Sequence, residues 1–362
     1  MHKPAGTPSS PASWWRPANL APWLALLSCI LYSCNGELMQ ALQHTTKASE
    51  GHVSPLLNLL LCHLGGLAFA PIVLCSEAQP ATYPPWQLRS SAFFFSFLLM
   101  GYNYAWLCSA KYLFVDLTNA VFQTSTALVY VASIWLFSEP VTSLRILGVG
   151  LCLGGTTLAS MSNEASQAGV DGGSLAHLTL GIFLASMAAV GVTFYQVLFR
   201  YFHGHLKYDI RFLMEFGMWV SIFHIVAILP LVLLADYVGV EKLSFPVGGI
   251  ARLGVAASAV IASTVNALYL CIVMWGTPML LPCASAFSLP LTVFLDVLLH
   301  GARPSGAELL GHAMVVIAVP LILNLFKKED KAAEVEEKLV NPASSLLARN
   351  TRRPTAYAED GI

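Results

Sequence analysis

The chain has 362 residues, of which 56% are hydrophobic and only 11% are charged, and its formal net charge is −1. Soluble globular domains carry roughly 25% charged residues, so this composition excludes a soluble enzyme and offers no basic surface for a nucleic acid. It predicts an all-α polytopic membrane protein.

Ten apolar stretches are long enough to cross a bilayer as helices. They cover residues 21–42, 54–75, 89–110, 115–137, 141–161, 175–201, 212–235, 248–274, 278–299 and 305–326. The connectors between them are too short to fold by themselves, so we expect no soluble domain outside the membrane. We expect a disordered cytoplasmic N-terminus over residues 1–20 and a charged cytoplasmic tail over residues 327–362.

The distribution of lysine and arginine predicts the orientation of the chain. With both termini in the cytoplasm, 14 of the 19 basic residues fall on the cytoplasmic side, and half of those 14 lie in the tail. The other five are Lys47, Lys111, Lys242, Arg252 and Arg303. This distribution favours cytoplasmic termini in the plasma membrane or an endomembrane.

The first two stretches carry one ionisable candidate each. Glu37 in the first stretch would cost about 2.5 to 3.5 kcal/mol at the centre of a membrane helix, so it faces either a cavity or the headgroup water at the helix end. His63 in the second stretch stands among leucines. A lone histidine in such a helix is more often a packing residue than a site.

The third and eighth stretches each place an asparagine three residues before a large aromatic residue, on one helical face. The pairs are Asn103 with Trp106 and Asn266 with Tyr269. An amide can fix the polar edge of a solute while an aromatic ring stacks on a ring or a cation. The alternative is that both asparagines hydrogen-bond to neighbouring helices and the aromatic residues only pack.

The fourth stretch carries a polar stripe. Its members are spaced i, i+3, i+7, i+10 and i+14, and they are Asp116, Asn119, Gln123, Thr126 and Tyr130. At 100° per residue these positions share one face, and a polar face inside a membrane has to meet water, solute or other polar groups. We therefore interpret the stripe as lining a cavity, although Asp116 could equally cap the start of the helix.

The ninth stretch carries a second polar face. Ser285, Ser288, Thr292 and Asp296 lie on one side of the expected helix, and Pro282 and Pro290 flank its two serines. Interrupted membrane helices often bind solutes, so this face is another candidate site. The alternative is that the hydroxyls only satisfy carbonyls that the prolines have freed.

The fifth and tenth stretches show small residues four positions apart. These residues are Gly150 with Gly154, followed directly by Gly155, and Ala307 with Gly311. The spacing indicates close helix packing, either within the chain or in a homodimer, and we expect no solute there.

The second half of the chain repeats the first. At a constant offset of 163 residues, nine identities join residues 103–158 to residues 266–321, among them Asn103 with Asn266 and Gly148 with Gly311. We expect two five-helix repeats over residues 21–161 and 175–326, joined by a linker over residues 162–174. Because five is an odd number of crossings, the second repeat would be inverted, and the halves could open alternately to either face.

Motifs of catalysis are absent from the sequence. It contains no Walker loop, HExxH motif, Rossmann glycine pattern or CxxC pair, so we expect no enzyme activity, no cofactor and no metal site. A channel would need a filter-like loop or a ring of charge, and neither is present. A membrane scaffold or receptor without transport is the remaining alternative to a carrier.

Several segments resemble a known family. Residues 136–142 (LFSEPVT) and 147–155 (LGVGLCLGG) resemble the fourth and fifth helices of the drug/metabolite transporter superfamily, the EamA-like repeat. Solute carrier family 35, subfamily F, is the most similar branch, through Asn103-Tyr104, Asp116 and residues 195–200, 288–290 and 296–299. The likeness covers residues 90–326, roughly the third to tenth stretches.

This resemblance implies a secondary carrier with a cavity between its halves, and the most similar branch has been associated with thiamine, a cationic vitamin. A cavity with Glu37, Asp116 or Asp296 would suit a cationic aromatic solute by charge pairing. The aromatic residues that could stack on such a solute are Trp106, Tyr195 and Tyr269. Where that branch has paired cysteines and a lysine in its fourth helix, this chain has residues 123–125 (QTS). A carrier of nucleotide sugars or of another metabolite is the alternative.

Overall fold

The computed structural model describes residues 17–46, 55–75, 83–110, 112–113, 115–167, 175–206, 209–240, 248–277, 279–301 and 303–323. The charged tail predicted over residues 327–362 lies outside these residues. So do most of the N-terminal segment 1–20 and the second part of the linker 162–174. The predictions for those segments stay untested.

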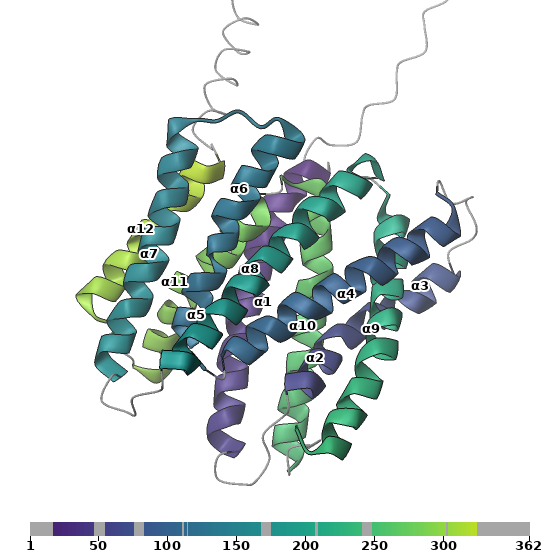
Figure 1. Cartoon of the computed structure of the whole chain (residues 1–362), viewed down its shortest axis with the longest axis horizontal. Coiled ribbons are helices and arrows are strands. Elements are labelled where there is room, and N and C mark those ends of the chain that lie inside the picture. Colours follow the sequence, from purple (N-terminus) through teal and green to yellow (C-terminus); the bar gives the residue numbers. More distant parts are fainter. Residues whose placement is uncertain are drawn as a thin grey trace, which may run out of the picture.

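Helical segments occupy all ten predicted stretches (Figure 1). They are α1 (Pro17–Thr46), α2 (Pro55–His63), the 3-10 helix η2 (Leu64–Phe69), α3 (Ala70–Cys75), α4 (Pro85–Ser109), α5 (Val115–Phe122), α6 (Thr124–Phe137), α7 (Ser143–Gln167), α8 (Leu175–His203), η3 (Gly204–Leu206), α9 (Ile210–Val238), α10 (Gly249–Trp275), α11 (Leu280–His300) and α12 (Gly306–Leu323). Among the described residues, eight segments are long and apolar enough to cross a membrane, and α1 and the α2–η2–α3 segment are not among them. The protein is therefore a multi-pass integral membrane protein, and the count of ten crossings stays a prediction.

The continuity of the fourth and ninth stretches differs from the prediction. The fourth stretch is divided at Gln123 into α5 and α6. The ninth remains one helix, α11, through Pro290. Pro282 stands in the first turn of α11, where a backbone N–H has no partner inside the helix to lose. The predicted interruption of the ninth stretch is wrong.

Two equivalent helix starts are each capped by a hydroxyl. Ser305 Oγ accepts the N–H of Glu308 at 3.1 Å, and Glu308 Oε2 accepts the N–H of Ser305 at 3.2 Å, which is a reciprocal capping box before α12. Thr142 stands 163 residues before Ser305, and its Oγ1 accepts the N–H of Arg145 at 3.4 Å before α7. The repeat that was predicted from identities thus extends to local backbone chemistry.

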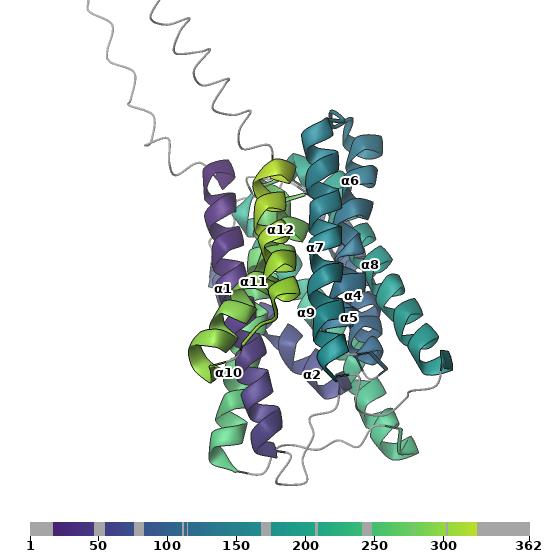
Figure 2. The ribbon, with the colours of Figure 1, turned by 90° about the vertical axis from the view of Figure 1, so that its left-hand side faces the viewer.

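The helices pack in pairs that recur between the two halves (Figure 2). α1 packs on α10 and α11, as α8 packs on α4 and on the α5–α6 segment. α4 packs on α9, as α10 packs on α2 and η2, while α7 packs on α12. The first half consists of α1, α2–η2–α3, α4, α5–α6 and α7, and the second half of α8 to α12 in the same order. Exchanging the two halves leaves these pairings unchanged.

Glycines bring α7 and α12 together. A Cβ on Gly148 would lie 3.1 Å from the carbonyl oxygen of Ala318, and a Cβ on Gly311 would lie 2.5 Å from that of Gly155. Positions 148 and 155 precede 311 and 318 by the repeat offset of 163 residues. The two contacts are therefore one contact with the helices exchanged, and it holds α7 and α12 antiparallel at a distance that only glycine allows.

The predicted glycine surface of α7 meets α12 at Gly154 and Gly155 and not at Gly150. Gly150 has no neighbouring atom within 4 Å of an added Cβ, whereas Gly148 and Gly155 meet α12. Two positions seven residues apart lie two helical turns apart on one face, and Gly150 lies off that face. In α12 the prediction holds for Gly311 and fails for Ala307, which is exposed.

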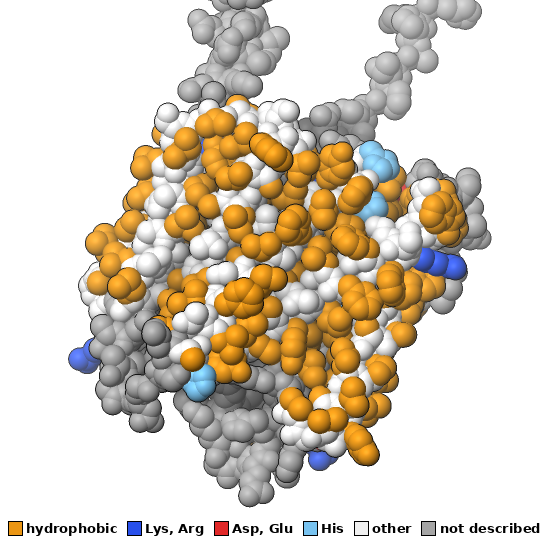
Figure 3. All heavy atoms as spheres, viewed as in Figure 1, with side chains coloured by type: hydrophobic (Ala, Val, Ile, Leu, Met, Phe, Trp, Pro, Cys, Tyr) orange, Lys and Arg blue, Asp and Glu red, His pale blue; other side chains and the backbone are white. Residues whose placement is uncertain are grey.

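The outer surface is apolar (Figure 3). Hydrophobic side chains cover most of the face in view, and lysine and arginine lie at its margins. Trp135 on α6 is 89% exposed and Val131, one turn earlier, is 61% exposed. Such a surface requires a lipid environment, because so many apolar side chains would be unfavourable in contact with water.

Candidate functional site

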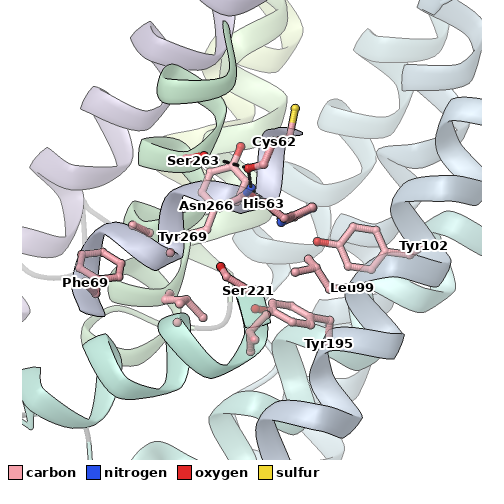
Figure 4. A pocket seen from close by; sticks show the side chains of 15 residues that line it. Cys62, His63, Phe69, Leu99, Tyr102, Tyr195, Ser221, Ser263, Asn266 and Tyr269 are labelled. Atoms are coloured by element: carbon pink, nitrogen blue, oxygen red, sulfur yellow. Dashed lines mark hydrogen bonds between the residues drawn. The ribbon is translucent and has the colours of Figure 1, made fainter. Parts of the chain in front are cut away.

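A cavity of about 40 Å³ lies where α2, η2 and α4 meet α8, α9 and α10 (Figure 4). Its fifteen lining residues are Cys62, His63, Gly66, Phe69, Leu99, Tyr102, Tyr195, Gly217, Val220, Ser221, Ser263, Asn266, Ala267, Tyr269 and Leu270. This volume holds a few water molecules, whereas small-molecule sites have roughly 300–1,000 Å³. The cavity as it stands is therefore too small for a drug-sized solute.

The lining is polar without being charged. Hydroxyl groups come from two serines and three tyrosines, an amide from Asn266 and an imidazole from His63. None of the fifteen residues is aspartate, glutamate, lysine or arginine. The cavity can donate and accept hydrogen bonds and can stack on a flat group, and it provides no fixed charge.

The end of α2 forms one wall of the cavity. α2 stops at His63, so the carbonyl of Cys62 is available to another helix, and Ser263 Oγ and Asn266 Nδ2 of α10 donate to it at 3.1 Å and 3.3 Å. In η2, a Cβ on Gly66 would lie 2.6 Å from the carbonyl oxygen of Gly217 in α9. Elements of both halves thus fix this wall.

Two histidines meet beside the cavity, His63 of α2 and His224 of α9. Their ring centroids lie 4.1 Å apart, and the rings are inclined at 49°. Asn266 Nδ2 lies 3.3 Å from His63 Nδ1. Because that nitrogen also faces the Cys62 carbonyl, it is the donor, so His63 Nδ1 accepts and the ring is neutral with its proton on Nε2.

His224 is buried without hydrogen bonds. It is 1% exposed, and neither of its ring nitrogens has a hydrogen-bond partner in the described part of the chain. The backbone of Ser96 in α4 is the polar group that faces it, outside hydrogen-bond geometry. A buried polar group in this condition costs about 1–3 kcal/mol, which the surrounding packing has to offset.

An aromatic cluster joins the halves at the end of the bundle where α1 begins. Phe95 of α4 lies edge-on to Phe199 of α8 and to Phe216 of α9, with ring centroids 5.5 Å and 5.8 Å apart. Ala21 of α1 belongs to the same buried cluster. The first half and the second half are therefore packed tightly together at this end.

A polar contact reinforces the same end. The hydroxyl of Tyr83, just before α4, donates to Glu215 Oε2 of α9 at 2.9 Å, and Arg211 Nε donates to Oε1 at 3.0 Å. Burial, together with the Glu215 carboxylate beside it, raises the pKa of the Tyr83 hydroxyl, so this group stays protonated and remains a donor. The contact ties the start of α4 to the start of α9.

Three residues predicted from the sequence line the cavity. Asn266 and Tyr269 share a face of α10, and Tyr195 of α8 lies across from them. Asn103 does not line the cavity, because its Nδ2 donates to the Leu99 carbonyl of its own helix at 2.9 Å. Trp106, half-buried on α4, is not a lining residue either.

The polar stripe of the fourth stretch faces the protein interior elsewhere. Gln123, Thr126 and Tyr130 are buried, and Tyr130 packs in a cluster with residues of α7, α8 and α11. Asn119 is half-buried, and the side chain of Asp116, in the first turn of α5, lies outside the described residues. The described members of the stripe thus lie against protein, and none of them lines this cavity.

The polar face of the ninth stretch is engaged with backbone carbonyls. Ser288 Oγ donates to the carbonyl of Ser285 at 2.6 Å, and Thr292 Oγ1 donates to that of Ser288 at 3.0 Å. These carbonyls are not the one that Pro290 frees, which is that of Ala286, so the hydroxyls make local bonds to their own helix rather than repair a proline break. Glu37, buried on α1, and Asp296, half-buried on α11, do not line the cavity.

The sequence interpretation missed four polar lining residues. They are His63, Tyr102, Ser221 and Ser263. For His63 a signal was present, because Gly65 and Gly66 follow it within three residues and glycine at that point favours the end of a helix. A helix end inside a membrane needs polar partners, and those partners line the cavity.

Metal binding finds no support in the described part of the chain. No group of three or more histidine, cysteine, aspartate or glutamate side chains is arranged there to hold an ion. His63 and His224 are two possible ligands without a third.

Comparison with known proteins finds transporters that are similar to part of the chain. Residues 19–161 match the EamA-like transporter family. An uncharacterized transporter of Schizosaccharomyces pombe is 24% identical over 186 residues, which cover 51% of this chain and 53% of the relative, so the match spans about half the length of each. These findings support an EamA-like drug/metabolite transporter and do not reach the thiamine branch.

Solved structures give the fold. The crystal structure of another protein aligns with a TM-score of 0.63 at 18% identity, and the alignment covers 84% of this chain and 98% of that one. The likeness therefore extends over both halves of the chain, beyond the residues that match the family.

Proposed function

We propose that the protein is a secondary transporter that moves a small organic solute by alternating access. The observation that carries this proposal is the position of the cavity. α2 and η2 from one half meet α9 from the other there, and α4 and α10 both line it, so these walls are counterparts under the exchange of halves, while α8 lines it without α1. A site on the axis that relates two halves can be exposed to either side by rocking one half against the other.

The repeated contacts support an inverted relation between the halves. The pairings are unchanged by exchange, and the Gly148 and Gly311 contacts are the same contact seen from each helix. An antiparallel α7–α12 pair is what a two-fold axis in the membrane plane produces. Ten crossings in two inverted five-helix repeats remain our proposal for the whole chain.

The uncharged lining favours a solute that carries hydrogen-bonding groups and no permanent charge. A cation such as thiamine would need a carboxylate partner in this apolar setting, and Glu37 and Asp296 lie outside the cavity. The sequence resemblance implies an organic cation such as thiamine, whereas the lining of this cavity favours an uncharged solute. A nucleotide sugar would need cationic partners, and the fifteen lining residues include none.

Asn266→Leu should weaken solute binding. Asn266 is the one amide that lines the cavity, where its Nδ2 faces the Cys62 carbonyl and His63, and leucine has a similar size without polar atoms. Loss of one buried hydrogen bond with a solute should weaken binding about tenfold or more. The measurement is the thermal stabilisation of the purified full chain by thiamine, by uracil and by a nucleotide sugar, each titrated separately.

The matched control for this variant is Asn103→Leu, the same change at the equivalent position of the first repeat. Its amide bonds to its own helix, so solute stabilisation should match that of the unaltered protein. If none of the three probes stabilises the protein, or if both variants respond alike, the cavity is not the solute site.

A further inference from the structure

The His63–His224 pair has no role in solute recognition as described so far, and its geometry is unusual for packing residues. The two imidazoles come from different halves and lie with ring centroids 4.1 Å apart. His63 is 6% exposed and His224 1% exposed. His63 lines the cavity, where a few waters can reach it, whereas His224 stands behind it.

Both rings are poised to accept a proton. His63 Nδ1 is an acceptor toward Asn266, and a neutral His224 leaves one ring nitrogen with a free lone pair, since neither nitrogen has a partner among the described residues. Two imidazoles this close repel each other when both are charged, so the pair would hold one proton in common. The titratable side chains around them are neutral ones, namely Cys62, Tyr102, Tyr195 and Tyr269.

Charged groups on the neighbouring helices are engaged elsewhere. On α9, Glu215 lies nine residues before His224, half a turn around the helix, and bonds Tyr83 and Arg211. On α4, Arg89 lies over the ring of Trp219 at 4.6 Å. Neither residue is among those that line the cavity.

Protonation of His63 would alter a contact between the halves. A proton on Nδ1 turns that nitrogen into a donor, so the ring could no longer accept from Asn266 Nδ2. The resulting charge also needs more solvation than the few water molecules that this small cavity can hold. Both effects favour a state in which α2 separates from α10 and the cavity widens.

Resting on the proposed carrier function, we propose that His63 and His224 form a shared proton-binding site, through which a proton is coupled to the exchange of access between the halves. The proton enters from water on one side, is held by one imidazole of the pair, and returns to water on the other side. Its binding shifts the conformational equilibrium because only the widened state can solvate it.

The test is a pH jump on proteoliposomes that hold the full chain, adsorbed on a solid-supported membrane, with no solute added. A jump from about pH 7.5 to about pH 5.5, which spans the ordinary titration range of histidine, should give a transient charge displacement. His63→Gln combined with His224→Gln should reduce this displacement to the level of protein-free liposomes. The matched control is His177→Gln, an exposed histidine at the start of α8, which should leave it unchanged.

A second variant guards against misfolding. His224→Phe keeps an aromatic ring and removes the nitrogens, so this single change should lower the charge displacement while the protein stays monodisperse. An unchanged displacement in the double variant, or none in the unaltered protein, overturns the proton site. Because no solute is present, a histidine-dependent displacement without any solute transport would instead contradict the carrier function alone.

Discussion

Gly311→Ala should lower the free energy of unfolding by about 1–3 kcal/mol, as overpacking of a close-packed contact does. The added Cβ would stand 2.5 Å from the carbonyl oxygen of Gly155 and 2.7 Å from the backbone nitrogen of Ala159. Both are backbone atoms, so α7 and α12 would have to separate along their length. Gly155→Ala should have a similar effect, since its Cβ would lie 2.5 Å from the Gly311 carbonyl oxygen.

The matched control is Gly150→Ala on the same helix. No atom lies within 4 Å of its Cβ position, and alanine favours helix over glycine by roughly 0.5–1 kcal/mol, so stability should be unchanged or raised. Thermal unfolding of the three purified variants in one detergent measures the difference. Equal losses at Gly150 and Gly311 would mean that the α7–α12 contact is not built as described.

Arg200→Met should also destabilise the fold, by about 1.5–3 kcal/mol, the range for a hydrogen bond from a charged donor. Arg200, near the end of α8, donates through Nη1 to the carbonyls of Val273, at 3.0 Å, and of Met274, in the last turn of α10. Carbonyls at a helix end have no partner within the helix, so methionine would leave them unsatisfied in a buried place.

Arg303→Met provides the comparison for this change, because Arg303 is an exposed arginine before α12. It should unfold at the temperature of the unaltered protein. Arg200→Lys should fall between the two, since an ammonium group keeps the charge and lacks the planar fork of the guanidinium. If Arg200→Met unfolds like Arg303→Met, the α8–α10 contact contributes no measurable stability.

Much of the fold could be predicted because the membrane restricts it. Long apolar runs can only be helices there, and the turns are marked by residues such as Pro140 and Pro304. Which residues of each helix face the neighbouring helix was harder to predict. Gly150 and Gly148 look alike in sequence, and only the angle at which α7 meets α12 decides that Gly148 is the one that packs.

The candidate site was predicted in part, for a related reason. Asn103 and Asn266 are the same residue at equivalent positions, yet one bonds to its own helix and the other reaches α2. That difference arises because α2 ends at His63 and presents a carbonyl to α10. The spacing of residues within α10 cannot predict where α2 ends. The sequence therefore indicates only a packing role for His63.

Counterflow tests the central claim most directly. Proteoliposomes loaded with unlabelled solute, chosen from whichever of thiamine, uracil and the nucleotide sugar stabilises the protein, receive the labelled form outside. Alternation between two inverted halves predicts saturable uptake that is faster in loaded liposomes than in empty ones and is reduced in Asn266→Leu. Uptake that rises linearly with concentration and ignores the internal solute would indicate a channel, and no uptake at all would indicate a scaffold or receptor; either result contradicts the account.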